Sequence, residues 1–167
     1  MGPISYVILV LLVWISIGLG GLLGRIAVEE LKVSKPYFIF FQKLLFFVII
    51  AIPLYEALGI LAVIIAAIFW FVLWILTKQR IIPHFLFILF GFWYFVSYLT
   101  HTIFAVTLLL ILYGFITGTL VLMQTKHKRL PQKFVKACPL VTTAFYKIFL
   151  QHWLFPVIAI LAYVLGQ

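Results

Sequence analysis

The sequence contains no aspartate and no asparagine, and its only acidic residues are Glu29, Glu30 and Glu56. The missing aspartates exclude the paired Asp carboxylates of many hydrolases and polymerases, and the missing asparagines exclude N-glycosylation. The single cysteine, Cys138, excludes an intramolecular disulfide and a cysteine-based metal cluster. The N-terminus also lacks the basic start and small-residue cleavage site of a secretory signal. We therefore expect its apolar run to be a retained helix.

Charge of either sign is scarce, because 9% of the residues are charged and 67% are hydrophobic. Soluble domains are about 45–50% apolar and about 25% charged. A domain of this length leaves a large fraction of its surface exposed, so it could not hide this much apolar surface from water. The composition therefore predicts an integral membrane protein of the all-α class, a polytopic bundle of transmembrane helices.

The lengths of the apolar runs predict the number of spans, since a spanning helix needs about 20 residues. The runs 37–77 and 81–123 are each long enough for two helices. The first is expected to turn near Pro53, Glu56 and Gly59, and the second at the polar cluster 97–102. The last run is long for one crossing, so it is expected to tilt, to kink at Pro156 or to begin on the membrane surface. The chain is thus predicted to be one membrane domain, 1–167, without an extramembrane domain and with six helices at about 3–24, 37–55, 57–77, 81–99, 102–123 and 139–166.

Ten of the twelve lysines and arginines lie in three predicted loops, 25–36, 78–80 and 124–137. The positive-inside rule places these loops in the cytoplasm and both termini on the other side. Lys43 and Lys147 fall within predicted helices, close enough to the basic side to snorkel. The third loop has one phenylalanine, Phe134, and no folded platform on which bases could stack, so nucleic acid is not predicted as a partner. It is expected to attract anionic lipid headgroups through Lys126, Lys128, Arg129, Lys133 and Lys136.

Two pairs of glycines are spaced four residues apart near the cytoplasmic ends of predicted helices. They are Gly20 and Gly24 in the first helix and Gly114 and Gly118 in the fifth. Small residues at this spacing let two helix backbones approach closely. Helix packing is the leading interpretation; a chance occurrence and a contact with substrate are the alternatives.

Ionisable residues inside a membrane are costly and often functional. In the last predicted helix, Thr143, Lys147 and Gln151 form a polar stripe at i, i+4 and i+8, and His152 follows. This stripe is a candidate hydrogen-bonded seam, a pocket for a headgroup, quinone or substrate, or a subunit contact. Glu56 is a candidate solvated carboxylate, a proton or cation site, or a contact with a partner subunit.

The four histidines are the candidate ligands for a haem or a zinc ion. His84 and His101 would lie about 26 Å apart on one helix, too far to share a metal. His101 and His152 could approach each other if the last helix shifts outward, which leaves an intramembrane b-type haem as an alternative. No His-x₃-His pair with a carboxylate companion indicates a zinc site.

No catalytic constellation is evident: the sequence has no G-x-S-x-G motif, P-loop or Gly-rich dinucleotide loop. We therefore predict no catalytic residue and no bound cofactor, with quinone and haem as the alternatives. The leading hypothesis is a non-catalytic membrane subunit of a larger complex, for instance a respiratory or other energy-transducing one, packing against helices, lipid or quinone. A small oligomeric transporter or channel is the second hypothesis, and an intramembrane b-type cytochrome is the third.

Overall fold

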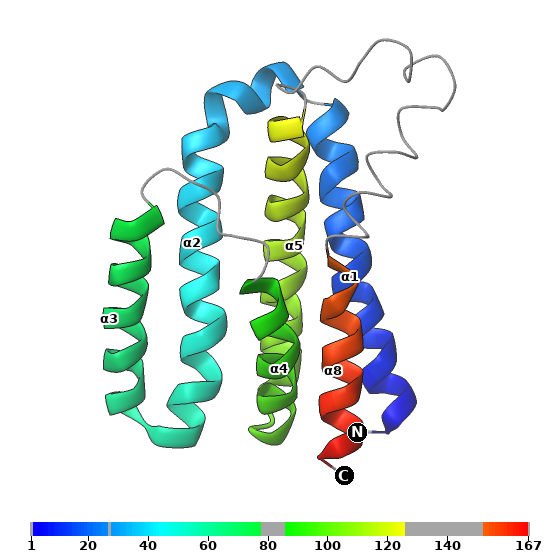
Figure 1. Ribbon diagram of the computed structural model, residues 1–167, viewed down its shortest axis with the longest axis vertical. Helices are drawn as coiled ribbons and strands as arrows, with labels where there is room; N and C mark the ends of the chain where they lie inside the picture. Colours follow the sequence, from blue (N-terminus) through cyan, green and yellow to red (C-terminus); the bar gives the residue numbers. More distant parts are fainter. Residues whose placement is uncertain (1, 27, 78–85, 126–151, 167) are drawn as a thin grey trace.

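The computed structural model describes residues 2–26, 28–77, 86–125 and 152–166 (Figure 1). These residues form helices and no strands, so the all-α prediction is confirmed for this part of the chain. The helices are α1 (Pro3–Ile26), α2 (Val28–Leu58), α3 (Ile60–Thr77), α4 (Leu86–Leu99), α5 (Ile103–Thr125) and α8 (Leu154–Leu165).

Among the described residues, three helical stretches are long and apolar enough to cross a membrane: Pro3–Gly24, Val33–Leu58 and Ile103–Val121. Shorter apolar stretches lie at Ile60–Val72, Leu89–Leu99 and Leu154–Leu165. At 1.5 Å per residue the 12 residues of α8 span only about 18 Å. A bilayer core is about 30 Å thick, so the described parts of the shorter helices do not by themselves establish further crossings.

Successive helices alternate in direction, so that α1, α3 and α5 run one way and α2, α4 and α8 run the other (Figure 1). Both chain ends lie at one end of the bundle. The ends of α1, α3 and α5 that lead toward the lysine- and arginine-containing segments point to the opposite end. α1 and α5 form the most extensive helix pair, α2 packs on α5, and α4 packs on α8.

The segment 25–36 was predicted as a loop, but helix continues through most of it. α1 extends to Ile26, and α2 begins at Val28. Hydropathy detects apolar runs, whereas residues such as Glu30 and Lys32 favour a helix without being apolar. Pro36 lies inside α2, and Figure 1 shows the helix changing direction in this region, as expected at a proline.

The first hairpin turns later than predicted. Pro53 lies inside α2, and Glu56 lies in its last turn rather than between two helices. The break is at Gly59, whose φ of 71° a glycine adopts without steric cost. The second hairpin turns at 100–102, as expected from the polar cluster, and His101 there has a φ of 59°.

The last predicted helix, 139–166, is described only from residue 152. α8 begins at Leu154, after Trp153. Pro156 therefore lies in the first turn of α8, where a helix needs no backbone donor from it. In the described part His152 is helical and Trp153 is in a turn, so the helix is interrupted just before α8. A kink at Pro156 stays a prediction.

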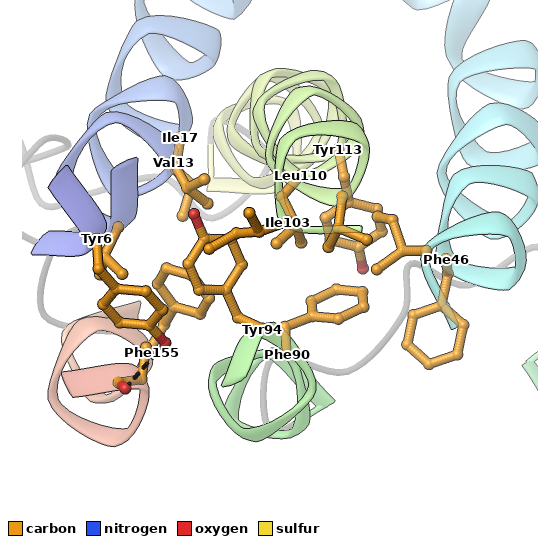
Figure 2. Packing of buried hydrophobic residues seen from close by; sticks show 14 of the residues in the cluster. Tyr6, Val13, Ile17, Phe46, Phe90, Tyr94, Ile103, Leu110, Tyr113 and Phe155 are labelled. Carbon is orange, nitrogen blue, oxygen red and sulfur yellow. Dashed lines mark hydrogen bonds between the residues drawn. The ribbon is translucent and has the colours of Figure 1, made fainter. Parts of the chain in front are cut away.

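The core consists of one inward-facing stripe from each of α1, α2, α4, α5 and α8. In α1 the stripe is Tyr6, Val10, Val13 and Ile17, a spacing that keeps the side chains on one helix face. Figure 2 shows Tyr6, Val13 and Ile17 of this stripe together with the rings of Phe90 and Tyr94 on α4 and of Phe155 on α8. The stripe of α8 has the same character and consists of Phe155, Ala159 and Tyr163.

Candidate functional site

At the α1–α5 interface, the glycine pair of each helix packs against the other helix. A methyl group added at Gly20 would collide with the carbonyl oxygen of Phe115, and one added at Gly118 with that of Ile17. Gly24 faces Thr119 at 3.0 Å from the position of an added Cβ. The contacts advance in the same direction along both helices, so this is a parallel pair held at close range. At Gly20 and Gly118 only a hydrogen atom fits.

Side-chain hydroxyls add hydrogen bonds to this interface. Thr119 Oγ1 donates to the carbonyl oxygen of Gly20 on α1 at 2.8 Å and also lies 2.9 Å from the carbonyl oxygen of Phe115. A neighbouring hydroxyl, Ser16 Oγ, donates to the carbonyl oxygen of Val13 at 2.6 Å. In a bilayer, close packing and hydrogen bonds between helices replace the hydrophobic driving force that acts in water.

A second polar contact joins α2 to α5. Gln42 Nε2 donates to Thr117 Oγ1 at 2.9 Å, and both side chains are buried. The hydroxyl of Tyr113, one turn away from Thr117 on α5, is hydrogen bonded to both of these side chains. The three residues form an uncharged network inside the bundle, which links α2 to the α1–α5 pair.

Lys43 adjoins this network and is buried, with 3% of its surface exposed. It was expected to snorkel to the basic rim, and this expectation was wrong. The reason is its position on α2, since Ile39 and Phe46, at i−4 and i+3, are buried on the same side of the helix. Its backbone carbonyl also accepts a hydrogen bond from Trp70 Nε1 of α3 at 2.7 Å.

Four tyrosines cluster near the opposite end of the bundle, where α1, α4 and α8 meet. Tyr6 stacks on Tyr163 with 4.4 Å between the ring centroids, and it also contacts Tyr94 and Tyr98. Its hydroxyl donates to the carbonyl oxygen of Ala159 at 3.1 Å. The rings pack on one another, so the cluster connects the three helices.

The candidate ionisable residues at the end of the bundle that holds the tyrosine cluster are exposed. Glu56 and His101 are both exposed, in the last turn of α2 and in the α4–α5 hairpin respectively. Lys43 and Glu56 are 13 positions apart on α2, which corresponds to about 20 Å. The solvated-carboxylate interpretation of Glu56 is compatible with this exposure.

His101 and His152 lie at different depths. His152 is buried one turn before Phe155, and the carbonyl oxygen of Phe155 faces Gly91 near the start of α4. His101 comes after the far end of α4, ten positions beyond Gly91 and thus about 15 Å away along the helix. Two nitrogen ligands of one metal lie only about 4 Å apart. This arrangement does not favour a bis-histidine haem between them.

Several predicted site residues lie outside the described ranges. They are Thr143, Lys147 and Gln151 of the polar stripe and the basic-loop residues Lys126, Lys128, Arg129, Lys133 and Lys136. Of the polar stripe and its neighbour, only His152 is described. In the part of the chain that is described, no three His, Cys, Asp or Glu side chains gather as a metal-binding group.

Sequence reasoning missed the Gln42–Thr117–Tyr113 network. The available signal was the adjacent pair Gln42 and Lys43 within an otherwise apolar run, since polar residues in a spanning helix tend to face protein. Thr117, the hydrogen-bond partner of Gln42 on α5, is 75 positions away in the sequence. Periodicity within one helix could not have found this partner.

Comparison with protein-family models, with curated proteins and with solved structures gives no match.

Proposed function

We propose that this protein is a non-catalytic, membrane-embedded subunit of a larger membrane complex, and that α3 is the helix that contacts its partner. The observation that carries the proposal is the packing of α3. Within the described chain it packs chiefly on α2 and lies at the edge of the bundle (Figure 1). The other described helices surround the common core.

The contact between α2 and α3 is formed by small side chains and an aromatic pair. Among the residues of α3 whose side chains are described, Ala62 and Ala66 are the buried ones, and small side chains at this spacing let α3 approach α2 closely. Next to them Trp70 contacts the ring of Phe47 at a centroid distance of 5.6 Å. The rest of the described surface of α3 is a set of large, exposed apolar side chains, namely Ile60, Leu61, Ile64, Ile65, Ile68, Phe71, Val72, Trp74 and Ile75.

The buried polar groups of the other helices support a structural function. The Gln42–Thr117 and Thr119–Gly20 bonds join helices of this chain to each other, and Tyr94 bonds to Thr107 at 2.7 Å. These bonds rigidify the bundle, and a rigid bundle with an apolar flank is suited to binding another transmembrane helix.

Photo-crosslinking from α3 tests the proposal. A benzophenone amino acid placed at Ile64 or Ile68 should give one discrete adduct with another membrane protein in native membranes. Gentle detergent extraction, native gel electrophoresis and mass spectrometry should find the same protein co-migrating with this chain in fixed stoichiometry.

The matched control is the same probe at Ile8 or Leu12, which are exposed on α1 to a similar degree. These positions should give lipid adducts and no discrete protein band. A native band that contains only this chain, with lipid adducts from both helices, would overturn the subunit proposal and the assignment of α3.

We also propose that the chain crosses the membrane six times, with both termini on the non-cytoplasmic side. The alternating directions of the six described helices support the count. The basic segments between them support the orientation through the positive-inside rule.

Single-cysteine labelling tests this topology, because Cys138 is the only native cysteine. In a Cys138→Ser background, Gly2→Cys should react with a membrane-impermeant maleimide on intact cells, whereas Lys128→Cys should react only after permeabilisation. Labelling of both positions from the same side would contradict the odd number of crossings between them. The reverse pattern would contradict the orientation.

A further inference from the structure

Pro53 leaves one backbone carbonyl of α2 without its usual donor. A helical carbonyl accepts a hydrogen bond from the N–H four residues later, and proline has no N–H. Pro53 is inside α2 and buried, so the carbonyl of Ile49 cannot be satisfied by its own helix. In a bilayer such a group costs several kcal/mol unless a neighbouring helix provides a donor.

The indole of Trp93 on α4 provides that donor. Its Nε1 donates to the carbonyl oxygen of Ile49 at 3.2 Å. One turn earlier on both helices, the rings of Phe46 and Phe90 pack at a centroid distance of 5.2 Å. The ring contact holds α4 against α2, and the hydrogen bond is directed to the backbone position that the proline has released.

The end of α2 beyond Pro53 has little other support. Its last four residues, Tyr55–Leu58, are all exposed, and Gly59 then turns the chain into α3 with a positive φ. Proline sites are the usual points at which a helix bends. The segment 49–53 therefore has the properties of a hinge, and beyond it lie the end of α2 and the turn into α3.

We infer that Trp93 is a latch on a proline hinge in α2: its indole N–H satisfies the Ile49 carbonyl released by Pro53 and holds the end of α2 and the following turn in place. The inference does not depend on the proposed function, because it concerns contacts within one chain.

A double-mutant cycle tests the hydrogen bond. Trp93→Phe keeps an aromatic ring and removes the donor, whereas Pro53→Ala returns the N–H to the helix. Trp93→Phe should lower the folding equilibrium constant by about threefold to tenfold when Pro53 is present. In the Pro53→Ala background, the fold-change in the folding equilibrium constant caused by Trp93→Phe should be at least about threefold smaller. The reason is that the Ile49 carbonyl then has a donor within its own helix. Reversible unfolding in mixed detergent–SDS micelles gives all four constants.

Trp70→Phe is the matched control. Its indole also donates to a backbone carbonyl of α2, that of Lys43. The residue four positions after Lys43 is Phe47, which has an N–H. The effect of Trp70→Phe should therefore be the same with Pro53 and with Pro53→Ala. A Trp93→Phe effect that is equally independent of Pro53 would overturn the inference and reduce Trp93 to a packing residue.

Hydrogen–deuterium exchange tests the hinge itself. In Trp93→Phe the amides of residues 54–60 should exchange about threefold to tenfold faster, while those of the α1–α5 interface should not change. Unchanged exchange at 54–60 in a folded Trp93→Phe protein would overturn the latch. In the double variant Trp93→Phe/Pro53→Ala, these amides should again exchange as slowly as in the unsubstituted protein.

Discussion

Gly118→Leu is expected to destabilise the bundle more than any substitution on its outer surface. Even the Cβ of a larger residue at this position would collide with the carbonyl oxygen of Ile17, and it would lie 2.8 Å from the backbone nitrogen of Gly21. These are backbone atoms of α1, which cannot rotate away as a side chain can. The helices must separate, and the Thr119–Gly20 hydrogen bond at 2.8 Å would be lost with them. We expect a loss of about 3 kcal/mol or more in the free energy of unfolding.

Reversible unfolding in mixed micelles measures this loss, with Ala105→Leu as the control. Ala105 is also on α5 and is exposed, so the added leucine points away from the core and should change the free energy by less than about 0.5 kcal/mol. Gly20→Leu, which would collide with the carbonyl oxygen of Phe115, should repeat the result from the other helix. Equal stabilities of Gly118→Leu and Ala105→Leu would contradict the close α1–α5 contact.

Tyr6→Ala is expected to cause the second large loss, about 3 kcal/mol in the free energy of unfolding. Tyr6 is fully buried and touches three other tyrosine rings. In a bilayer the removed side chain is not transferred to water, so the cost comes from the cavity, the lost ring contacts and the lost hydrogen bond. The hydrogen bond to the carbonyl oxygen of Ala159 is one part of this total.

A series at this position separates the two contributions. Tyr6→Phe keeps the ring and removes only the hydroxyl, so it should cost about 1 kcal/mol. Ile8→Ala, at an exposed position two residues along α1, should cost less than about 0.5 kcal/mol. The same unfolding measurement applies to all three variants. A Tyr6→Phe protein as unstable as Tyr6→Ala would contradict the ring-packing explanation and assign the effect to the hydrogen bond.

Helix positions were predictable to the extent that apolar runs coincide with helices. The run that begins at Pro3 is α1, and the polar cluster 97–102 correctly marks the turn between α4 and α5. The prediction of the first loop was wrong because residues 28–36, five of which are charged or carry a hydroxyl group, are nevertheless helical. The first hairpin was also misplaced: it was predicted near Pro53, Glu56 and Gly59, whereas α2 continues through Pro53 to Leu58. A proline inside a helix and a proline in a turn look alike in sequence. The difference is whether another helix satisfies the released carbonyl, as Trp93 does here.

For the candidate site residues, too, patterns within one helix were predictable and contacts between helices were not. Gly20, Gly24, Gly114 and Gly118 were visible as spaced pairs, because the spacing of one helix is a local property. Their opposition across α1 and α5 was not visible, and neither was the Gln42–Thr117 bond. Lys43 was assigned to the rim from its distance to the basic loop, whereas its direction from the axis of α2 decides its burial.

Composition and the order of residues by themselves determined that this chain is helical and suited to a membrane, because apolar content and run length follow from the chain alone. They also determined which end of each helix is basic. Only the tertiary structure decided that α1 pairs with α5, that α3 packs chiefly on α2, and that Trp93 meets the Ile49 carbonyl. The physical reason is that helix pairing in a bilayer depends on close packing and on directed hydrogen bonds between distant residues. Hydropathy measures transfer from water to lipid, which is nearly the same for every apolar face.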